Sequence, residues 1–189
     1  MKRMVFLFLF ILFFHAPAQS ENNRWTSYCR IILEEAVIRG KNISEIMPGP
    51  GVKTRPLFVT LKKLNTTRGC AGTLQPLFST IGEELSYFTV KAATSDSRYP
   101  PVRPDELKDI AVIITFPGEL RAVNSIREYN PWKHGLLVRK DGREGVILPC
   151  EGKTGSYALR KAIVQSGIDE IKGADIYIFE CETITEKIK

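Results

Sequence analysis

The 189-residue sequence predicts an α+β fold in a single domain. Segments with the apolar spacing of helices and short, partly β-branched apolar segments typical of strands follow one another irregularly, without the regular alternation of a doubly wound α/β sheet. The chain is 43% hydrophobic and 25% charged, which is a globular composition. A chain of this length can bury one core. It contains no internal repeat, heptad pattern or low-complexity tract.

The first 18 residues are expected to be a secretory signal peptide. Lys2 and Arg3 precede an apolar run over residues 4–14, and Ala16-Pro17-Ala18 forms an A-x-A cleavage motif. The run is shorter than the roughly 20 apolar residues of a membrane-spanning helix. We therefore expect a periplasmic or secreted domain over residues 19–189, which meets the membrane only during export.

The charge pattern argues against nucleic acid as a partner. Loss of Lys2 and Arg3 with the signal peptide lowers the formal net charge from +6 to +4. The remaining basic residues are scattered among acidic ones, whereas nucleic-acid-binding proteins cluster them on one face. The four cysteines of an exported chain would meet an oxidising compartment, where disulfides can form.

A helix and two extended segments are expected at the start of the domain. Apolar positions recur at helical spacing over residues 26–39, and Gly40 can end that helix. Residues 41–56 are rich in Pro and Gly, which favours an irregular surface loop. Residues 57–61 have the composition of a buried strand, and a second extended segment is expected over residues 70–74.

A second helix and a further strand are expected next. Apolar residues spaced by four, three and four give one apolar face to a helix over residues 81–94. Residues 99–104 include three prolines, which hold the backbone extended before a helical turn from Asp105. Residues 110–116 have the composition of a strand.

The last part of the chain predicts a hairpin, a helix and a strand. Residues 136–138 and 146–148 flank Asp141-Gly142, a dipeptide suited to a tight turn, and the residues around it suggest a loop longer than two. A helix over residues 157–165 and a strand over residues 176–181 complete the domain.

One hexapeptide, Arg68-Gly69-Cys70-Ala71-Gly72-Thr73, suggests chemistry. It places a thiol beside a guanidinium between two glycines. A nearby cation favours the thiolate and can lower a cysteine pKa from about 8.5 into a range of roughly 3.5 to 7.5. The glycines would leave the backbone open to a close substrate.

This hexapeptide, together with Phe58-Val59-Thr60-Leu61 before it, resembles the strand and RGCIGT signature of the AMMECR family. Further segments resemble that family's motifs in the same order: Ser95-Asp96-Ser97-Arg98-Tyr99-Pro100-Pro101 its D-x-R-F-x-P, Glu106-Leu107 its E-L, His134-Gly135 its H-G, and Leu148-Pro149 its L-P. The agreement extends over residues 24–181, so the chain is identified as a member of the family.

The resemblance implies an α+β core with a mixed or antiparallel sheet flanked by helices, and a smaller β-rich lobe. It also implies a pathway link to Memo-type and radical-SAM proteins, but no particular reaction, substrate or cofactor. The chain differs from the family pattern in having Ala71 in place of Ile and Cys150-Glu151 after the L-P motif. The family's later acidic-x-x-Trp feature is absent around residues 152–157.

One hypothesis makes the region around Cys70 a catalytic site. Cys70 would be the nucleophile, His134 its general base or acid, and Arg68 an anion clamp, with Asp96 or Glu151 orienting the histidine. The surrounding binding residues would be Arg68, Gly69, Gly72, Thr73, Asp96 and Arg98. In the structural alternative Cys70 is an inert small hydrophobe, Arg68 pairs with a carboxylate, and the glycines serve a turn or bulge.

Three other interpretations stay open at this stage. Cys70 could pair with Cys150, and Cys29 with Cys181, as structural or redox-active disulfides. A binding module could collect an anionic ligand or peptide without chemistry, through Arg68, Arg98 and Lys133. A metal is not predicted, although Cys70, Cys150, His134 and Glu151 would be a plausible ligand set if they met.

Overall fold

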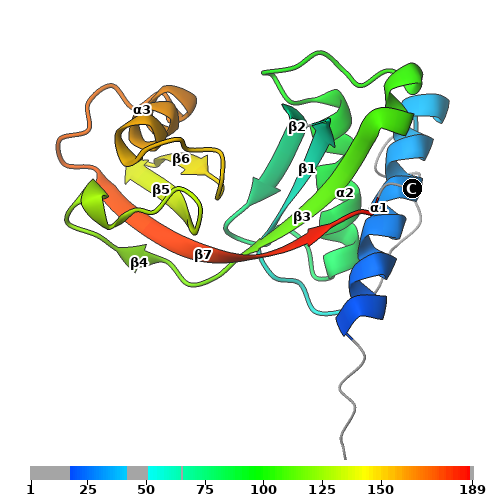
Figure 1. Cartoon of the computed structure of the whole chain (residues 1–189), viewed down its shortest axis with the longest axis horizontal. Helices are drawn as coiled ribbons and strands as arrows, with labels where there is room; N and C mark the ends of the chain where they lie inside the picture. The colour runs from blue at the N-terminus through cyan, green and yellow to red at the C-terminus, as the bar shows by residue number, and fades with distance from the viewer. Residues whose placement is uncertain (1–17, 42–50, 65, 188–189) are drawn as a thin grey trace, which may run out of the picture.

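The computed structural model describes residues 18–41, 51–64 and 66–187, in which the chain forms two lobes joined by one long strand (Figure 1). The larger lobe contains α1 (Ala18–Arg39), β1 (Leu57–Lys63), β2 (Thr66–Thr73), α2 (Ile81–Thr94), the 3-10 helix η2 (Pro104–Asp109) and β3 (Ile110–Pro117). The smaller lobe contains β4 (Arg121–Ala122), the 3-10 helix η3 (Ile126–Glu128), β5 (His134–Lys140), β6 (Arg143–Ile147) and α3 (Gly155–Ser166). The last strand, β7 (Asp175–Thr185), passes through both.

All strand pairs of the described sheet are antiparallel, in the order β2-β1-β3-β7-β5-β6, with β4 added beside β7. The second half of β7 pairs with β3, and its first half pairs with β5. The predicted α+β class, with a sheet flanked by helices, is confirmed. Because β7 serves both lobes, the sheet curls and its two end strands, β2 and β6, come to face each other (Figure 1).

The core of the larger lobe lies between α1, α2 and one face of the sheet. Leu57, Val59 and Leu61 alternate toward it from β1 and are fully buried. Helix α2 has the predicted bounds, and a capping box fixes its start: Thr80 Oγ1 accepts the Glu83 N–H, while the Glu83 carboxylate accepts the Thr80 N–H.

Helix α1 begins eight residues before the predicted residue 26. The expectation rested on apolar spacing, whereas residues 18–25 are mostly polar. Between residues 18 and 39 there is neither Gly nor Pro to end a helix, and the chain leaves it at Gly40, whose φ of 63° is left-handed. None of the helices in the described ranges is long and apolar enough to span a membrane. The predicted signal peptide lies outside those ranges, apart from Ala18.

The smaller lobe is a hairpin covered by α3. The expected long loop is wrong, because β5 continues to Lys140 and β6 begins at Arg143. Asp141 and Gly142 alone form the turn, with φ values of 49° and 75° that match a type I′ hairpin turn. Thr154 caps the N-terminus of α3 by accepting the Tyr157 N–H.

Candidate functional site

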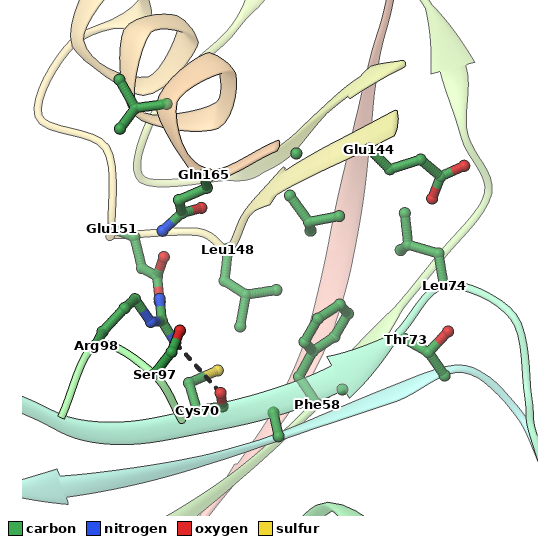
Figure 2. A pocket seen from close by; sticks show the side chains of 15 residues that line it. Phe58, Cys70, Thr73, Leu74, Ser97, Arg98, Glu144, Leu148, Glu151 and Gln165 are labelled. Atoms are coloured by element: carbon green, nitrogen blue, oxygen red, sulfur yellow. Dashed lines mark hydrogen bonds between the residues drawn. The ribbon is translucent and has the colours of Figure 1, made fainter. Parts of the chain in front are cut away.

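A cleft of about 670 Å³ lies between the two lobes (Figure 2). Its walls come from both ends of the curled sheet, from the loop after α2 and from α3. It is lined by Phe58, Cys70, Ala71, Gly72, Thr73, Leu74, Ser97, Arg98, Glu144, Gly145, Val146, Leu148, Glu151, Val164 and Gln165. Phe58 and Leu148 of this lining also belong, with Phe179, to a small apolar cluster that joins the two lobes.

Cys70 lies on β2 opposite Thr60 of β1, on the face of the sheet turned away from the helices. Thr60 Oγ1 donates to Cys70 Sγ over 3.3 Å. Burial raises the pKa of the Cys70 thiol to about 11, and the nearby Arg98 only partly opposes this effect. The expected lowering of the pKa by a cation is therefore not found, because loss of hydration outweighs it.

Asp96 and Arg98 hold the backbone of Cys70 from the loop that follows α2. The Asp96 carboxylate accepts the Cys70 N–H over 2.8 Å. Arg98 Nη2 donates to the Cys70 carbonyl over 3.2 Å (Figure 2). The two side chains form a bidentate ion pair of 2.7 and 2.8 Å. Burial acts to raise the pKa of Asp96, but the bonds from Arg98 and Cys70 outweigh it and lower that pKa.

Arg98 also reaches the smaller lobe. The side-chain amide of Gln165 in α3 lies between Arg98 and the Val146 carbonyl. In the amide orientation that forms hydrogen bonds with both, its oxygen accepts from Arg98 Nη1 over 3.2 Å and its nitrogen donates to the Val146 carbonyl over 3.2 Å. Glu151, which Lys161 pairs with over 3.1 Å, lies on the same side of the cleft (Figure 2). The guanidinium of Arg98 is therefore fixed in position by groups from both lobes.

Arg68 does not line the cleft. Its guanidinium makes a bidentate contact with Glu106 and also donates to the carbonyls of Pro100 and Pro101. Its side chain is 13% exposed. The predicted anion clamp is thus not assembled, and the alternative, a pair with a carboxylate, is what the structure contains.

The two motif glycines serve close packing. Gly69 faces α2, where a Cβ atom would lie 2.0 Å from the Ala92 carbonyl oxygen. A Cβ at Gly72 would lie 2.3 Å from the Phe58 ring. Between Thr67 and Gly69, Arg68 has no partner on β1, so a bulge interrupts the ladder there. Of the two, only Gly72 borders the cleft, together with Thr73.

His134 lies in a different pocket, of about 570 Å³, with Arg121, Lys133 and Glu180 among its lining residues. Its Nδ1 accepts the Asn130 N–H over 3.1 Å. Burial, followed by the charge of Lys133, lowers the pKa of His134. The structure does not bring His134 together with Cys70, so the nucleophile and base pair expected from the sequence is not formed.

All four cysteines are free thiols in the structure. Cys29 is fully buried in the core of the larger lobe, whereas Cys181 packs against the apolar cluster of Phe58, Leu148 and Phe179. Cys150 is exposed and belongs to the turn after β6. Within the described residues, no group of three or more His, Cys, Asp or Glu side chains could hold a metal.

The family model described as AMMECR1 matches residues 26–184. The chain belongs to the AMMECR1 family. It is 39% identical to a protein of Thermotoga maritima over 158 residues, which cover 80% of this chain and 91% of the relative. It is 32% identical to a protein of Methanosarcina mazei over 70% of this chain and 72% of the relative.

The fold is similar to the crystal structure of an uncharacterized protein from Pyrococcus horikoshii, with a TM-score of 0.73. That similarity covers 89% of this chain and 93% of the other, at 23% sequence identity. The structural match supports the two-lobed fold described above. The relatives' names state no activity.

Most of the AMMECR1 motif residues at the cleft belong to the larger lobe, and Leu148 of the L-P motif lines it from the smaller lobe. Glu144, Val164 and Gln165 form part of the opposite wall, and no sequence motif pointed to them. Glu144 and Gln165 belong to β6 and α3, which line the same cleft as β2 because the sheet curls.

Cys70 is expected to react slowly with iodoacetamide at pH 7. A thiol with a pKa of about 11 is almost entirely protonated there, so its alkylation should be at least about a hundredfold slower than that of an ordinary exposed thiol. Its rate should rise steeply above pH 9. Peptide mass spectrometry over a time course measures this, with exposed Cys150 as the internal control. Labelling of Cys70 at pH 7 as fast as Cys150 would contradict the prediction.

Proposed function

We propose that this AMMECR1 domain is a binding module that holds a ligand non-covalently in the cleft between its lobes. The observation that carries the proposal is the fixed guanidinium of Arg98, which is held by Asp96 and the Cys70 carbonyl at the edge of a cleft of about 670 Å³. Ligand pockets have volumes of this order and combine apolar walls with a few fixed polar groups. A side chain held in place before binding loses little entropy when the ligand arrives.

Thiol chemistry is the alternative use of the same cleft. It is favoured by the position of Cys70 on the lining and by the hydrogen bond from Thr60. It is opposed by the raised thiol pKa, and by the position of His134 in another pocket. Binding needs neither a thiolate nor a base, so we prefer it.

The proposal is tested by filling the cleft. Val164 of α3 lines the cleft and is 75% exposed, so Val164→Trp should occupy the space without disturbing the core. In a fragment screen followed by amide chemical shifts of the full chain, fragments should shift cleft residues such as Gly72 and Gln165. Val164→Trp should weaken those fragments at least about tenfold, or roughly 1.4 kcal/mol.

The matched control is Arg160→Trp, which adds the same ring at an exposed position of α3 outside the cleft lining. It should leave fragment binding unchanged. If no fragment shifts the cleft residues, or if both variants weaken binding equally, the cleft is not a ligand site.

Export is part of the proposed function. The basis is the apolar run over residues 4–14 followed by Ala16-Pro17-Ala18. Intact-mass measurement of the protein recovered outside the cytoplasm of its native host should give a chain that begins at Gln19. Recovery of the uncleaved chain from the cytoplasm alone would exclude export.

A further inference from the structure

We infer that the ligand of the cleft is an extended peptide segment that carries a lysine or arginine and adds to the free edge of β2 at Gly72. This inference rests on the proposed binding function and names its ligand class. It follows from two features of the cleft: the direction of the backbone groups at its floor, and the sign of the charges on its walls.

The free edge of β2 presents backbone groups to the cleft. In an antiparallel pair, alternate residues turn their N–H and C=O toward the partner strand and away from it. Cys70 directs both groups away from β1, since its N–H reaches Asp96 and its carbonyl accepts from Arg98. Gly72, two residues later and opposite Phe58, therefore directs its N–H and C=O to the same free side. Gly72 lines the cleft, so these groups are accessible there.

The Asp96 and Arg98 pair already imitates a neighbouring strand at Cys70. A carboxylate accepts the N–H and a guanidinium donates to the C=O, as the carbonyl and amide of an added strand would. The pair therefore closes the edge at Cys70 and leaves Gly72 as the next position with both groups free within the described residues. An added segment would begin its pairing at Gly72.

The apolar lining of the cleft, which comes from both lobes, gives side-chain specificity. Successive side chains of an extended peptide point to opposite sides, so alternate residues would face the same wall. Apolar side chains there would meet a lining that includes Phe58, Leu74, Val146 and Leu148. This arrangement, with main-chain pairing on one strand and pockets for alternate side chains, is that of peptides bound by strand addition.

The charges of the cleft favour a basic peptide. Each charged side chain of the lining has an ion-pair partner outside it: Arg98 pairs with Asp96, Glu144 with Arg139 and Glu151 with Lys161. Arg98 directs its donors to Asp96, the Cys70 carbonyl and Gln165. Within the described residues each glutamate is contacted through one carboxylate oxygen, so its other oxygen can accept from a ligand cation.

The negative charge of Glu151 affects the pKa of Cys70, which lines the cleft, and that of Tyr129, which is outside the cleft lining. Burial raises the pKa of Cys70 most, the Thr60 hydrogen bond opposes this effect, and the charge of Glu151 adds to the rise. For Tyr129, burial and then the charge of Glu151 raise the pKa to about 12. An acidic ligand would be repelled, which replaces the earlier expectation of an anionic one.

The test measures the affinity of three capped tripeptides for the full chain by calorimetry: N-acetyl-Val-Lys-Val-amide, its Glu counterpart, and the Lys peptide with N-methylated backbone amides. The Lys peptide should bind at least about tenfold more tightly than either of the others, or roughly 1.4 kcal/mol. On binding it, the Gly72 amide should exchange its hydrogen more slowly. Glu151→Gln should reduce the preference for Lys over Glu, while Glu180→Gln, a carboxylate in the pocket of His134, should not.

The inference would be overturned if the Lys and Glu peptides bound with equal affinity, or if the N-methylated Lys peptide bound as tightly as the unmethylated one. It would also be overturned if none of the three peptides bound. The fragment screen separates this failure from that of the proposed function. Fragments that shift the cleft residues while the peptides do not bind would leave a binding cleft with another kind of ligand. Absence of both signals would remove the cleft as a site.

Discussion

Replacing Arg68 by alanine is expected to lower the free energy of unfolding by about 3 kcal/mol, because it leaves a buried carboxylate with an incomplete set of partners. Glu106 is 5% exposed and receives two hydrogen bonds from Arg68, of 3.1 and 2.8 Å. Lys63 contacts the same carboxylate over 3.1 Å and would remain, which places the loss at the lower end for a broken buried pair. Urea denaturation of both proteins at pH 7 measures the difference.

As the pH falls, the free energy of unfolding of the wild-type protein should decrease more than that of Arg68→Ala. The hydrogen bonds from Arg68 outweigh burial and hold the pKa of Glu106 well below its ordinary value of 4.5. A carboxyl group whose folded pKa is lowered stabilises the fold fully above its unfolded pKa, and this contribution is lost as the pH falls toward the folded one. The difference between the two proteins should therefore be full above about pH 5 and shrink below pH 4.5.

Two further variants serve as controls. Arg103→Ala removes a guanidinium that pairs with Asp105 where both side chains are 69% exposed, so solvent screens the pair and its loss should be much smaller than that of Arg68→Ala. Arg68→Lys keeps the charge but loses the bidentate contact and the bonds to Pro100 and Pro101, so its loss should be intermediate. If Arg68→Ala proved as stable as Arg103→Ala, the guanidinium would not be a structural group, and its role as an anion clamp would return.

The elements that the sequence predicted well are those whose determinants are local. Helix α2 begins and ends at the predicted residues, because an apolar face coincides with the capping pair Thr80 and Glu83. The Asp141-Gly142 turn was located correctly but its loop was judged too long, since polar strand ends carry no apolar signal. Pairs such as Arg139 with Glu144 continue the ladder to the turn.

The candidate site was predicted only in part, because its geometry is set by long-range contacts. Cys70, Gly72, Thr73 and Arg98 do line one cleft. The sequence analysis placed His134 among them. In the structure His134 of β5 pairs with Glu180 of β7, and both residues line another pocket. Glu144 and Gln165 could not be found from local patterns, since their place opposite β2 depends on β7 joining both halves of the sheet.

Gly69→Ala should destabilise the fold by about 3 kcal/mol or more, through overpacking between β2 and α2. The added methyl carbon would lie 2.0 Å from the Ala92 carbonyl oxygen and 3.0 Å from its carbon, and both are backbone atoms that no side-chain rotation can move. Ala92 belongs to α2, so relief requires the helix to shift against the sheet. Thermal and urea unfolding of the variant measure the loss.

The matched control for Gly69→Ala is Gly51→Ala, where an added Cβ meets nothing within 4 Å and the backbone is not left-handed. Its unfolding free energy should change by less than about 0.5 kcal/mol. A large loss at Gly69 and none at Gly51 would assign this motif glycine to helix packing, as Arg68→Ala would assign the arginine to the pair with Glu106. Arg68 and Gly69 would then set the position of β2, and with it that of Cys70 and Gly72 at the cleft. A stable Gly69→Ala variant that lost ligand binding would instead return Gly69 to the binding surface.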